Sequence, residues 1–186
     1  MRERGYAYIV GVDEAGAGAL AGPVVAGAVI LQEDQPIEGL ADSKTLSVKK
    51  REKLYAEIIL HAQAWAFGMA TVEEIDMLGI RPANYLAMRR AIEKIPHAQF
   101  AFVDAWTVPQ LHIPQQGIIR GDKTIACIAA GSIVAKVTRD HMMQDLHAQF
   151  PQYGFDIHKG YGTKVHRDAI RVHGCSSIHR KSFTLT

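Results

Sequence analysis

Four acidic residues lie at the ends of short apolar segments or just beyond them, and acids in such positions are candidates for chemistry. They are Asp13, Glu14, Asp104 and Asp122. A carboxylate beside a core strand is partly desolvated, which is costly unless positive charge pairs with it. Because clustered carboxylates repel one another and hard oxygen ligands select Mg²⁺ or Mn²⁺, we expect a divalent-cation site at these acids.

Such a site points to hydrolysis of phosphodiesters. Two divalent cations about 3.5–4 Å apart catalyse in-line displacement, one activating water and the other stabilising the leaving oxygen. The alternative is that the four acids are helix caps and strand-end salt bridges, which for Asp122 taken alone is the better interpretation.

A glycine-rich segment follows the first two acids. Gly16, Gly18 and Gly22 fit a dinucleotide-binding pattern, but that interpretation requires a helix to start inside the glycines. Here Pro23 and a β-type run follow instead, and the preceding acids would repel a pyrophosphate. The glycines are better explained as positions where backbone amides approach a ligand closely.

The elements that must position these residues alternate between β-type and helical patterns. Strands are expected at 6–12, 23–31, 64–71, 100–104 and 117–120, the first two forming a hairpin-like pair. Helices are expected at 46–61 with Ser47 as N-cap, at 72–95 with interruptions at Gly79 and Pro82, at 128–150 and at 164–173. Interleaved and then trailing helices predict an α/β sheet covered by helices.

Composition favours a single domain. The chain has 186 residues, 48% of them hydrophobic and 22% charged, which suits one domain over 1–186 with a sizeable core. No apolar run reaches the length of a transmembrane helix, and the charged start does not resemble a secretory signal. Two cysteines without a CxxC pair are typical of a reducing compartment. We therefore expect a cytoplasmic protein with no membrane contact.

Charge is unevenly distributed. Residues 1–150 carry 15 Lys and Arg against 17 Asp and Glu, whereas residues 151–186 carry 6 against 2, with four histidines. A basic C-terminal helix and tail beside an acidic body is what a phosphate-binding surface next to a metal site produces. A merely solvated tail explains the same charges equally well.

Motifs spread in order over nearly the whole chain resemble those of the ribonuclease HII family. They are Gly-Val-Asp-Glu-Ala-Gly at 11–16, Leu-Ala-Gly-Pro-Val-Val at 20–25, Asp-Ser-Lys at 42–44, Val-Asp at 103–104, Gly-Asp at 121–122, the run at 128–140 that ends in Arg-Asp, Lys-Gly-Tyr-Gly-Thr at 159–163 and His-Arg-Lys-Ser-Phe at 179–183. The resemblance implies an RNase H-like fold: a mixed five-stranded sheet flanked by helices, with a C-terminal helical portion.

The resemblance also implies an activity. Family members are endonucleases dependent on Mg²⁺ or Mn²⁺ that cut RNA–DNA hybrids and duplex DNA with embedded ribonucleotides. They cut on the 5′ side of the ribonucleotide and leave 3′-hydroxyl and 5′-phosphate ends. Carried over by motif, the catalytic and metal-binding residues are Asp13, Glu14, Asp104 and Asp122, with Asp140 in a supporting role. We expect a monomer whose partner is nucleic acid.

Substrate-binding residues carry over in the same way. The segment of Gly16, Ala17 and Gly18 matches the one through which the family recognises the 2′-hydroxyl, largely by backbone groups. Tyr161 matches a tyrosine that stacks on the deoxyribose after the ribonucleotide. Candidates for phosphate contacts are Lys44, Lys136, Lys164, His166, Arg180 and Lys181.

The chain departs from the family pattern at several places, among them Thr124, in a stretch where lysine is common. Ala17 stands where the family has arginine, and Ala105-Trp106 follows the third acid where glycine is usual. Loss of a guanidinium that could pair with phosphate predicts weaker substrate binding, with discrimination between RNA and DNA retained.

Two other functions remain open at this stage. A junction resolvase with the same fold would cut all-DNA substrates, and a hybrid-binding module that has lost activity would bind without cutting. His158 and His166 could be compared with zinc ligands, but no cysteine or third histidine has suitable spacing.

Overall fold

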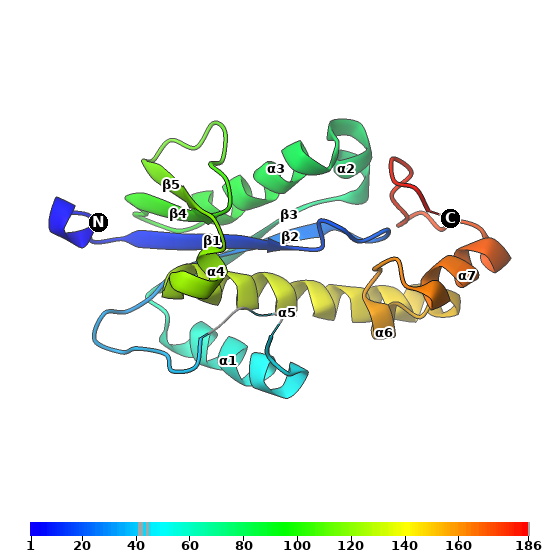
Figure 1. The fold of residues 1–186 in the computed structure, drawn as a ribbon, viewed down its shortest axis with the longest axis horizontal. Helices are drawn as coiled ribbons and strands as arrows, with labels where there is room; N and C mark the ends of the chain where they lie inside the picture. Colours follow the sequence, from blue (N-terminus) through cyan, green and yellow to red (C-terminus); the bar gives the residue numbers. More distant parts are fainter. Residues whose placement is uncertain (41–42, 44, 186) are drawn as a thin grey trace.

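A five-stranded mixed sheet forms the centre of the protein in the computed structural model, which describes residues 1–40, 43 and 45–185 (Figure 1). The strand order is β3-β2-β1-β4-β5. β1 pairs antiparallel with β2 and parallel with β4, so it is the central strand. The strands are β1 (Ile9–Ala15), β2 (Val24–Ile30), β3 (Ala64–Ala70), β4 (Phe100–Asp104) and β5 (Gln115–Ile118).

Helices cover both faces of the sheet. The long helix α5 packs on β1 and β2 from one side and carries α1 on its outer surface, whereas α3 packs on β3, β2 and β1 from the other (Figure 1). The helices are α1 (Val48–His61), α2 (Val72–Leu78), α3 (Ile80–Glu93), α4 (Gly121–Thr124), α5 (Ala126–Gln149), α6 (Phe155–His158) and α7 (Lys164–His173), with 3₁₀ turns η1 (Arg2–Arg4) and η2 (Pro151–Tyr153). The predicted α/β architecture with a C-terminal helical portion is confirmed.

The prediction for the first strand is wrong at its end. We expected the strand to stop before the acids, but β1 runs through Asp13 and Glu14 to Ala15. The reason is its antiparallel partner, since the pairs Asp13 with Gly27 and Glu14 with Ala26 continue the ladder. The first two acids are therefore held by strand pairing rather than by a loop.

Other boundaries differ in smaller ways. Of the two interruptions expected in 72–95, only Gly79 breaks the helix. Pro82 is the third residue of α3, where its missing N–H costs nothing because the first turn has no acceptor for it. The fifth strand ends two residues earlier than expected, and the expected loop at 151–162 contains η2 and α6. Ser47 caps α1 as predicted, accepting the Lys50 N–H over 3.3 Å.

The helix α5 lies unusually close to the sheet because glycines meet at the contact. A Cβ on Gly27 would lie 2.3 Å from the Gly131 carbonyl oxygen, and one on Gly11 would lie 2.2 Å from the backbone of Cys127.

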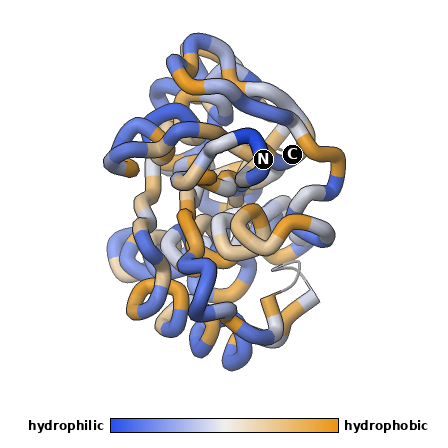
Figure 2. The backbone as a smooth tube through the Cα atoms, turned by 90° about the vertical axis from the view of Figure 1, so that its left-hand side faces the viewer, coloured by the Kyte–Doolittle hydropathy of each residue, from blue (hydrophilic) through white to orange (hydrophobic). Residues whose placement is uncertain are grey.

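Within the helices, hydrophobic and hydrophilic residues alternate along the tube, as one-sided burial requires (Figure 2). No helix in the described part of the chain has the length and hydrophobicity to cross a bilayer.

Candidate active site

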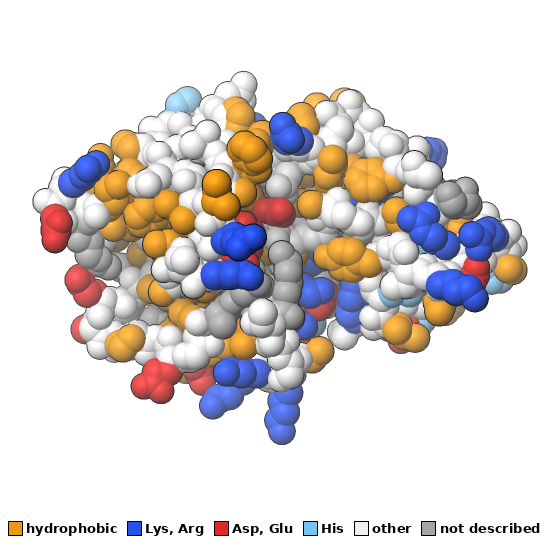
Figure 3. Space-filling view, viewed as in Figure 1, with side chains coloured by type: hydrophobic (Ala, Val, Ile, Leu, Met, Phe, Trp, Pro, Cys, Tyr) orange, Lys and Arg blue, Asp and Glu red, His pale blue; other side chains and the backbone are white. Residues whose placement is uncertain are grey.

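The sheet register brings two of the predicted catalytic acids side by side. Val12 of β1 pairs with Val103 of β4, so Asp13 and Asp104 follow side by side on adjacent parallel strands. Asp104 Oδ1 accepts the Gly121 N–H over 2.7 Å, which draws the start of α4, and Asp122 with it, to the same edge. Acidic and basic side chains gather near the middle of one face of the molecule (Figure 3).

Asp13 lies in surroundings that disfavour a negative charge. Its side chain is 3% exposed. Oδ1 accepts the Glu14 N–H over 2.7 Å, but Oδ2 is buried with no hydrogen-bond partner among the described residues. Burial raises the pKa of Asp13 well above its ordinary value, and the charges of Glu14 and Asp104 raise it further, against the opposing effect of the Ser132 hydroxyl.

These surroundings fit a divalent cation by their chemistry. As placed, no three His, Cys, Asp or Glu side chains within 1–40, 43 and 45–185 are grouped closely enough to hold one. The donors, however, are hard carboxylate oxygens, and the partnerless Oδ2 of Asp13 is a buried acceptor that still needs positive charge. A cation bound there would offset the burial and the repulsion that raise the Asp13 pKa.

The glycine segment after β1 is held by a buried arginine. Arg180 donates from Nη2 to the Gly16 carbonyl over 2.8 Å, from Nη1 to that of Ala17 over 3.0 Å, and from Nε to that of Gly22 over 3.0 Å. We expected Arg180 to contact phosphate, but it is 0% exposed and its guanidinium is engaged by main-chain oxygens. Burial, with the nearby charge of Arg139, lowers its pKa to about 9.

A second buried arginine reinforces the same segment and was missed in the sequence. Arg139 of α5 donates to the carbonyls of Pro23 over 2.9 Å, Lys159 over 2.9 Å and Ala21 over 3.1 Å. Gly16, with φ of 94°, leaves the space that the Arg139 side chain fills. Two buried cations, held by carbonyl dipoles instead of carboxylates, thus shape the loop from both sides.

The hydrogen bonds from Arg180 determine where the N–H groups of the glycine segment point. All peptide bonds described are trans, so the N–H of each peptide lies opposite its carbonyl. Because Arg180 takes the carbonyls of Gly16 and Ala17, the N–H groups of Ala17 and Gly18 point away from it. Gly16, Ala17 and Gly18 line a cavity of about 470 Å³, which Glu14 and Tyr161 line as well.

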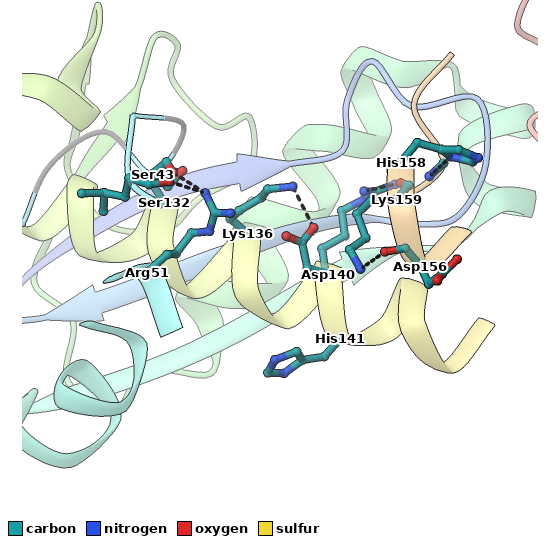
Figure 4. A network of polar contacts seen from close by, with 12 residues as sticks. Ser43, Arg51, Ser132, Lys136, Asp140, His141, Asp156, His158 and Lys159 are labelled. Carbon is teal, nitrogen blue, oxygen red and sulfur yellow. Dashed lines mark hydrogen bonds and ion pairs between the residues drawn. The ribbon is translucent and has the colours of Figure 1, made fainter. Parts of the chain in front are cut away.

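Lys136 and Tyr161 also face this cavity, as expected of substrate-binding residues. Lys136 Nζ lies 2.7 Å from Asp140 Oδ1 (Figure 4). It also lies 5.5 Å from the Tyr161 ring centroid. The guanidinium of Arg139 lies 5.3 Å from the same ring. Asp140, for which a supporting role is predicted, therefore contacts Lys136.

His166 lies in a buried chain of hydrogen bonds, although we expected it to contact phosphate. The Ser176 N–H donates to His179 Nδ1 over 2.9 Å, so the proton of His179 is on Nε2. That atom lies 3.1 Å from His166 Nε2, and His166 Nδ1 lies 3.0 Å from the Tyr161 carbonyl, which can only accept. Both rings are thus neutral, and His166 is 0% exposed. This series of hydrogen bonds therefore holds the backbone of Tyr161 in place.

The remaining phosphate candidates differ in their placement. Lys164 lies on α7 with a side chain that is 93% exposed, and its Nζ is 3.9 Å from Asp168. Lys181 is exposed, and its backbone N–H donates to Asp76. Lys44 lies outside the described residues. Its neighbour Ser43 shares a hydrogen bond of 2.9 Å with Ser132 (Figure 4).

One signal in the sequence could have identified more of this site. Ser132, Lys136 and Asp140 are spaced four residues apart, and Arg139 is seven residues from Ser132, so all four share one face of α5. A face of polar and charged residues on a helix that is otherwise buried against a sheet indicates an internal polar site. We singled out only Lys136 and Asp140.

Comparison with known proteins agrees with this geometry. The family model described as ribonuclease HII matches residues 10–186. Proteins named ribonuclease HII from Burkholderia pseudomallei (strain 668) and Burkholderia thailandensis are each 53% identical over 176 residues, covering 94% of this chain and 82% of the relative.

Solved structures match the fold over nearly its whole length. The ribonuclease H2 of Pyrococcus horikoshii OT3 has a TM-score of 0.78 and 25% identity, covering 95% of this chain and 94% of that one. The RNase HII of Archaeoglobus fulgidus, solved in a complex with PCNA, has a TM-score of 0.81 and 26% identity, covering 96% of each chain. A Bst-RNase HIII in complex with Mn²⁺ shares the fold with a TM-score of 0.80 at 16% identity, covering 96% of this chain and 67% of that one. The chain with this site therefore belongs to the ribonuclease HII family.

Proposed function

We propose that this endoribonuclease of the RNase H type hydrolyses the phosphodiester on the 5′ side of a ribonucleotide, in RNA–DNA hybrids or in duplex DNA with embedded ribonucleotides, leaving 3′-hydroxyl and 5′-phosphate ends. The observation that carries the proposal is Asp13, a buried carboxylate with a partnerless oxygen beside Asp104. Such a buried carboxylate needs a cation. Divalent cations held in this way catalyse hydrolysis of the phosphodiester bonds of nucleic acids.

Four acids would hold the cation, which we take to be Mg²⁺ or Mn²⁺: Asp13, Glu14, Asp104 and Asp122. When bound, it supplies Lewis acidity to the scissile phosphate. The protein excludes water from Asp13 and orients Asp104 through the Gly121 N–H.

Recognition of the ribonucleotide is assigned to the glycine segment. The outward amides of Ala17 and Gly18 donate to the 2′-hydroxyl, and Arg180 fixes their direction from behind. Tyr161 packs against the sugar of the following deoxynucleotide, where its rigid ring leaves no room for a 2′-hydroxyl. Lys136, restrained by Asp140, contacts a phosphate nearby.

A cleavage assay tests the proposal. We expect a DNA duplex with a single ribonucleotide to be cut in Mg²⁺ or Mn²⁺, an all-DNA duplex to remain intact, and Asp13→Ala to abolish cleavage. Equal cutting of both duplexes would favour a junction resolvase. Binding without any cutting would favour a module that has lost activity.

The missing arginine at Ala17 gives a prediction of its own. Ala17→Arg adds a guanidinium beside the substrate cleft, and we expect kcat/KM to rise about tenfold through a lower KM, with the preference for a ribonucleotide unchanged. Steady-state cleavage at fixed salt measures it. Unchanged kcat/KM would show that the site has no unmet need for the charge at this position.

The basic C-terminal segment gives a further prediction. Residues 151–186 would add to substrate binding through Lys164 and Lys181, so Lys164→Gln and Lys181→Gln should each raise KM by a share of the salt-dependent affinity.

We also propose a cytoplasmic monomer. Light scattering over a range of concentrations tests the oligomeric state, and cell fractionation tests the compartment.

A further inference from the structure

A second cavity opens beside the catalytic acids, on the side of α3. Its volume is about 220 Å³, and it lies between the ends of β1 and β4 and the first turns of α3. Glu14 and Asp104 form part of its wall, and the rest includes Ala17, Arg81, Asn84 and Trp106. It is therefore continuous with the proposed active site, and two of the departures from the family pattern, at Ala17 and at 105–106, lie on it.

Arg81 places an unneutralised cation at this cavity. Its guanidinium carbon lies 5.6 Å from the centroid of the Trp106 ring. No hydrogen bond or ion pair to Arg81 is found among the residues that the structure describes, and Arg81 is exposed. Of the described residues that line the cavity, Arg81 alone is cationic. A guanidinium held over an aromatic face keeps all its N–H donors available for an anion.

Trp106 is an exposed aromatic in a fixed position. It is 62% exposed, which leaves a large apolar face open to solvent. The preceding residue, Ala105, has φ of 61°, and its N–H bonds to the Ile118 carbonyl over 2.9 Å. The Trp106 N–H bonds to the Asp104 carbonyl over 2.8 Å. This tight turn presents the ring directly after a catalytic acid.

Asn84 adds a polar group that lacks a partner. Its Oδ1 is buried, and no hydrogen bond to it is found within the described residues. Asn84 lies on α3, three residues after Arg81, so both side chains face the same cavity. A buried acceptor without a donor is rare in folded proteins and indicates that a ligand supplies one.

We propose that this cavity is a subsite for one nucleotide of the substrate strand next to the scissile phosphate. Arg81 binds its phosphate, the Trp106 face packs against its sugar, and Asn84 Oδ1 accepts a hydrogen bond from it. The assignment rests on the proposed function, because the occupant is the strand that the four acids cut. Arg81 thus supplies, from α3, the positive charge that Ala17 does not.

Variants of the two rim residues test the subsite. We expect Arg81→Gln to raise KM about tenfold for the single-ribonucleotide duplex with kcat within twofold, and to reduce the slope of log KM against log salt by about one. Trp106→Ala should raise KM without changing that slope. The matched control is Arg4→Gln, which removes the same charge ahead of the opposite end of β1. An Arg81→Gln variant that behaves like Arg4→Gln would overturn the proposal.

A double variant tests the relation between Arg81 and Ala17. If both positions serve one phosphate region, Ala17→Arg should lower KM more in the Arg81→Gln background than in the parent protein. Equal effects in the two backgrounds would show that Arg81 does not take the place of the absent arginine. Circular dichroism spectra that overlay those of the parent protein exclude misfolding as the cause.

A binding measurement separates this proposal from the proposed function. Fluorescence anisotropy with the same duplex in EDTA needs no cleavage. If the parent protein binds the duplex in EDTA but does not cut it in Mg²⁺ or Mn²⁺, the proposed function fails. A tenfold weaker Kd for Arg81→Gln would still support the subsite in that case. If Kd is the same for Arg81→Gln and Arg4→Gln, the subsite fails whatever the protein cuts.

Discussion

Asp13 shows at the scale of one residue how function and stability conflict. The carboxylate is buried beside two other acids, so its charge is unfavourable in the protein alone. Its Oδ2 has no partner in the described part of the chain. A neutral side chain would be more stable here, and the charge of Asp13 fits the proposed role in holding a cation.

This conflict gives a prediction. In EDTA at pH 7, we expect Asp13→Asn to raise the free energy of unfolding by about 1–2 kcal/mol, a few degrees in melting temperature, while it abolishes cleavage. Differential scanning calorimetry measures the shift. Asp34→Asn, at an exposed acid, is the control and should leave the melting temperature nearly unchanged.

Manganese provides the complementary test. Added Mn²⁺ should raise the melting temperature of the parent protein, because ligands that bind only the native state stabilise it. The Asp13→Asn variant should show little or none of this rise. Equal shifts in both proteins would mean that Asp13 does not hold the ion.

At the scale of elements, contact between α5 and the sheet positions much of the site. Gly27 and Gly131 let two backbones meet where a Cβ would come within 2.3 Å of a carbonyl. Ser132, next to Gly131, is thereby kept close enough to Asp13 to influence its pKa. The glycines thus affect Asp13 through the helix that they allow to approach the sheet.

Replacing one of these glycines should therefore damage both fold and activity. We expect Gly27→Ala to lower the free energy of unfolding by about 3 kcal/mol, since neither backbone can move away freely. Gly18→Ala is the control, because no atom of the described residues lies within 4 Å of its added Cβ and its φ is not positive. Urea unfolding compares the two. Equal destabilisation would contradict the close packing.

Much of this arrangement could be predicted from the sequence, and the exceptions share a cause. Apolar periodicity predicted the five strands and the main helices, because burial of one face dictates it. The end of β1 was mispredicted because it depends on pairing with β2. The burial of Arg180 and His166 could not be foreseen, since it depends on carbonyls more than 150 residues away for Arg180 and on His179 for His166.

At the scale of the whole molecule, three buried histidines link the C-terminal segment to the active site. The rings of His158 and His166 stack with centroids 4.4 Å apart, and His166 bonds to His179. Burial lowers the pKa of all three, that of His166 to about 4. Between that value and about 6.5, the unfolded chain binds protons that the native protein does not.

Stability should therefore fall as the pH falls through this window. From pH 7 to pH 5, His166 alone accounts for a loss of about 2 kcal/mol in the free energy of unfolding. Asp13 acts in the opposite direction, because its pKa is raised, so the measurement belongs in the Asp13→Asn background. Urea unfolding at both pH values should show a smaller loss for His166→Gln than for its parent. The exposed His173→Gln should match the parent.

The bonds from Arg180 to the Gly16 segment also constrain the order in which the protein can mature during translation. The two partners are 164 residues apart, so the ribosome makes the loop long before it makes the arginine that shapes it. A nascent chain that stops before residue 180 already contains all four predicted catalytic acids. Without the arginine, however, the N–H groups of the Gly16 segment are not held in one direction. We therefore expect chains that end before residue 180 not to cut nucleic acid. A variant with a stop codon at position 180 would test this directly.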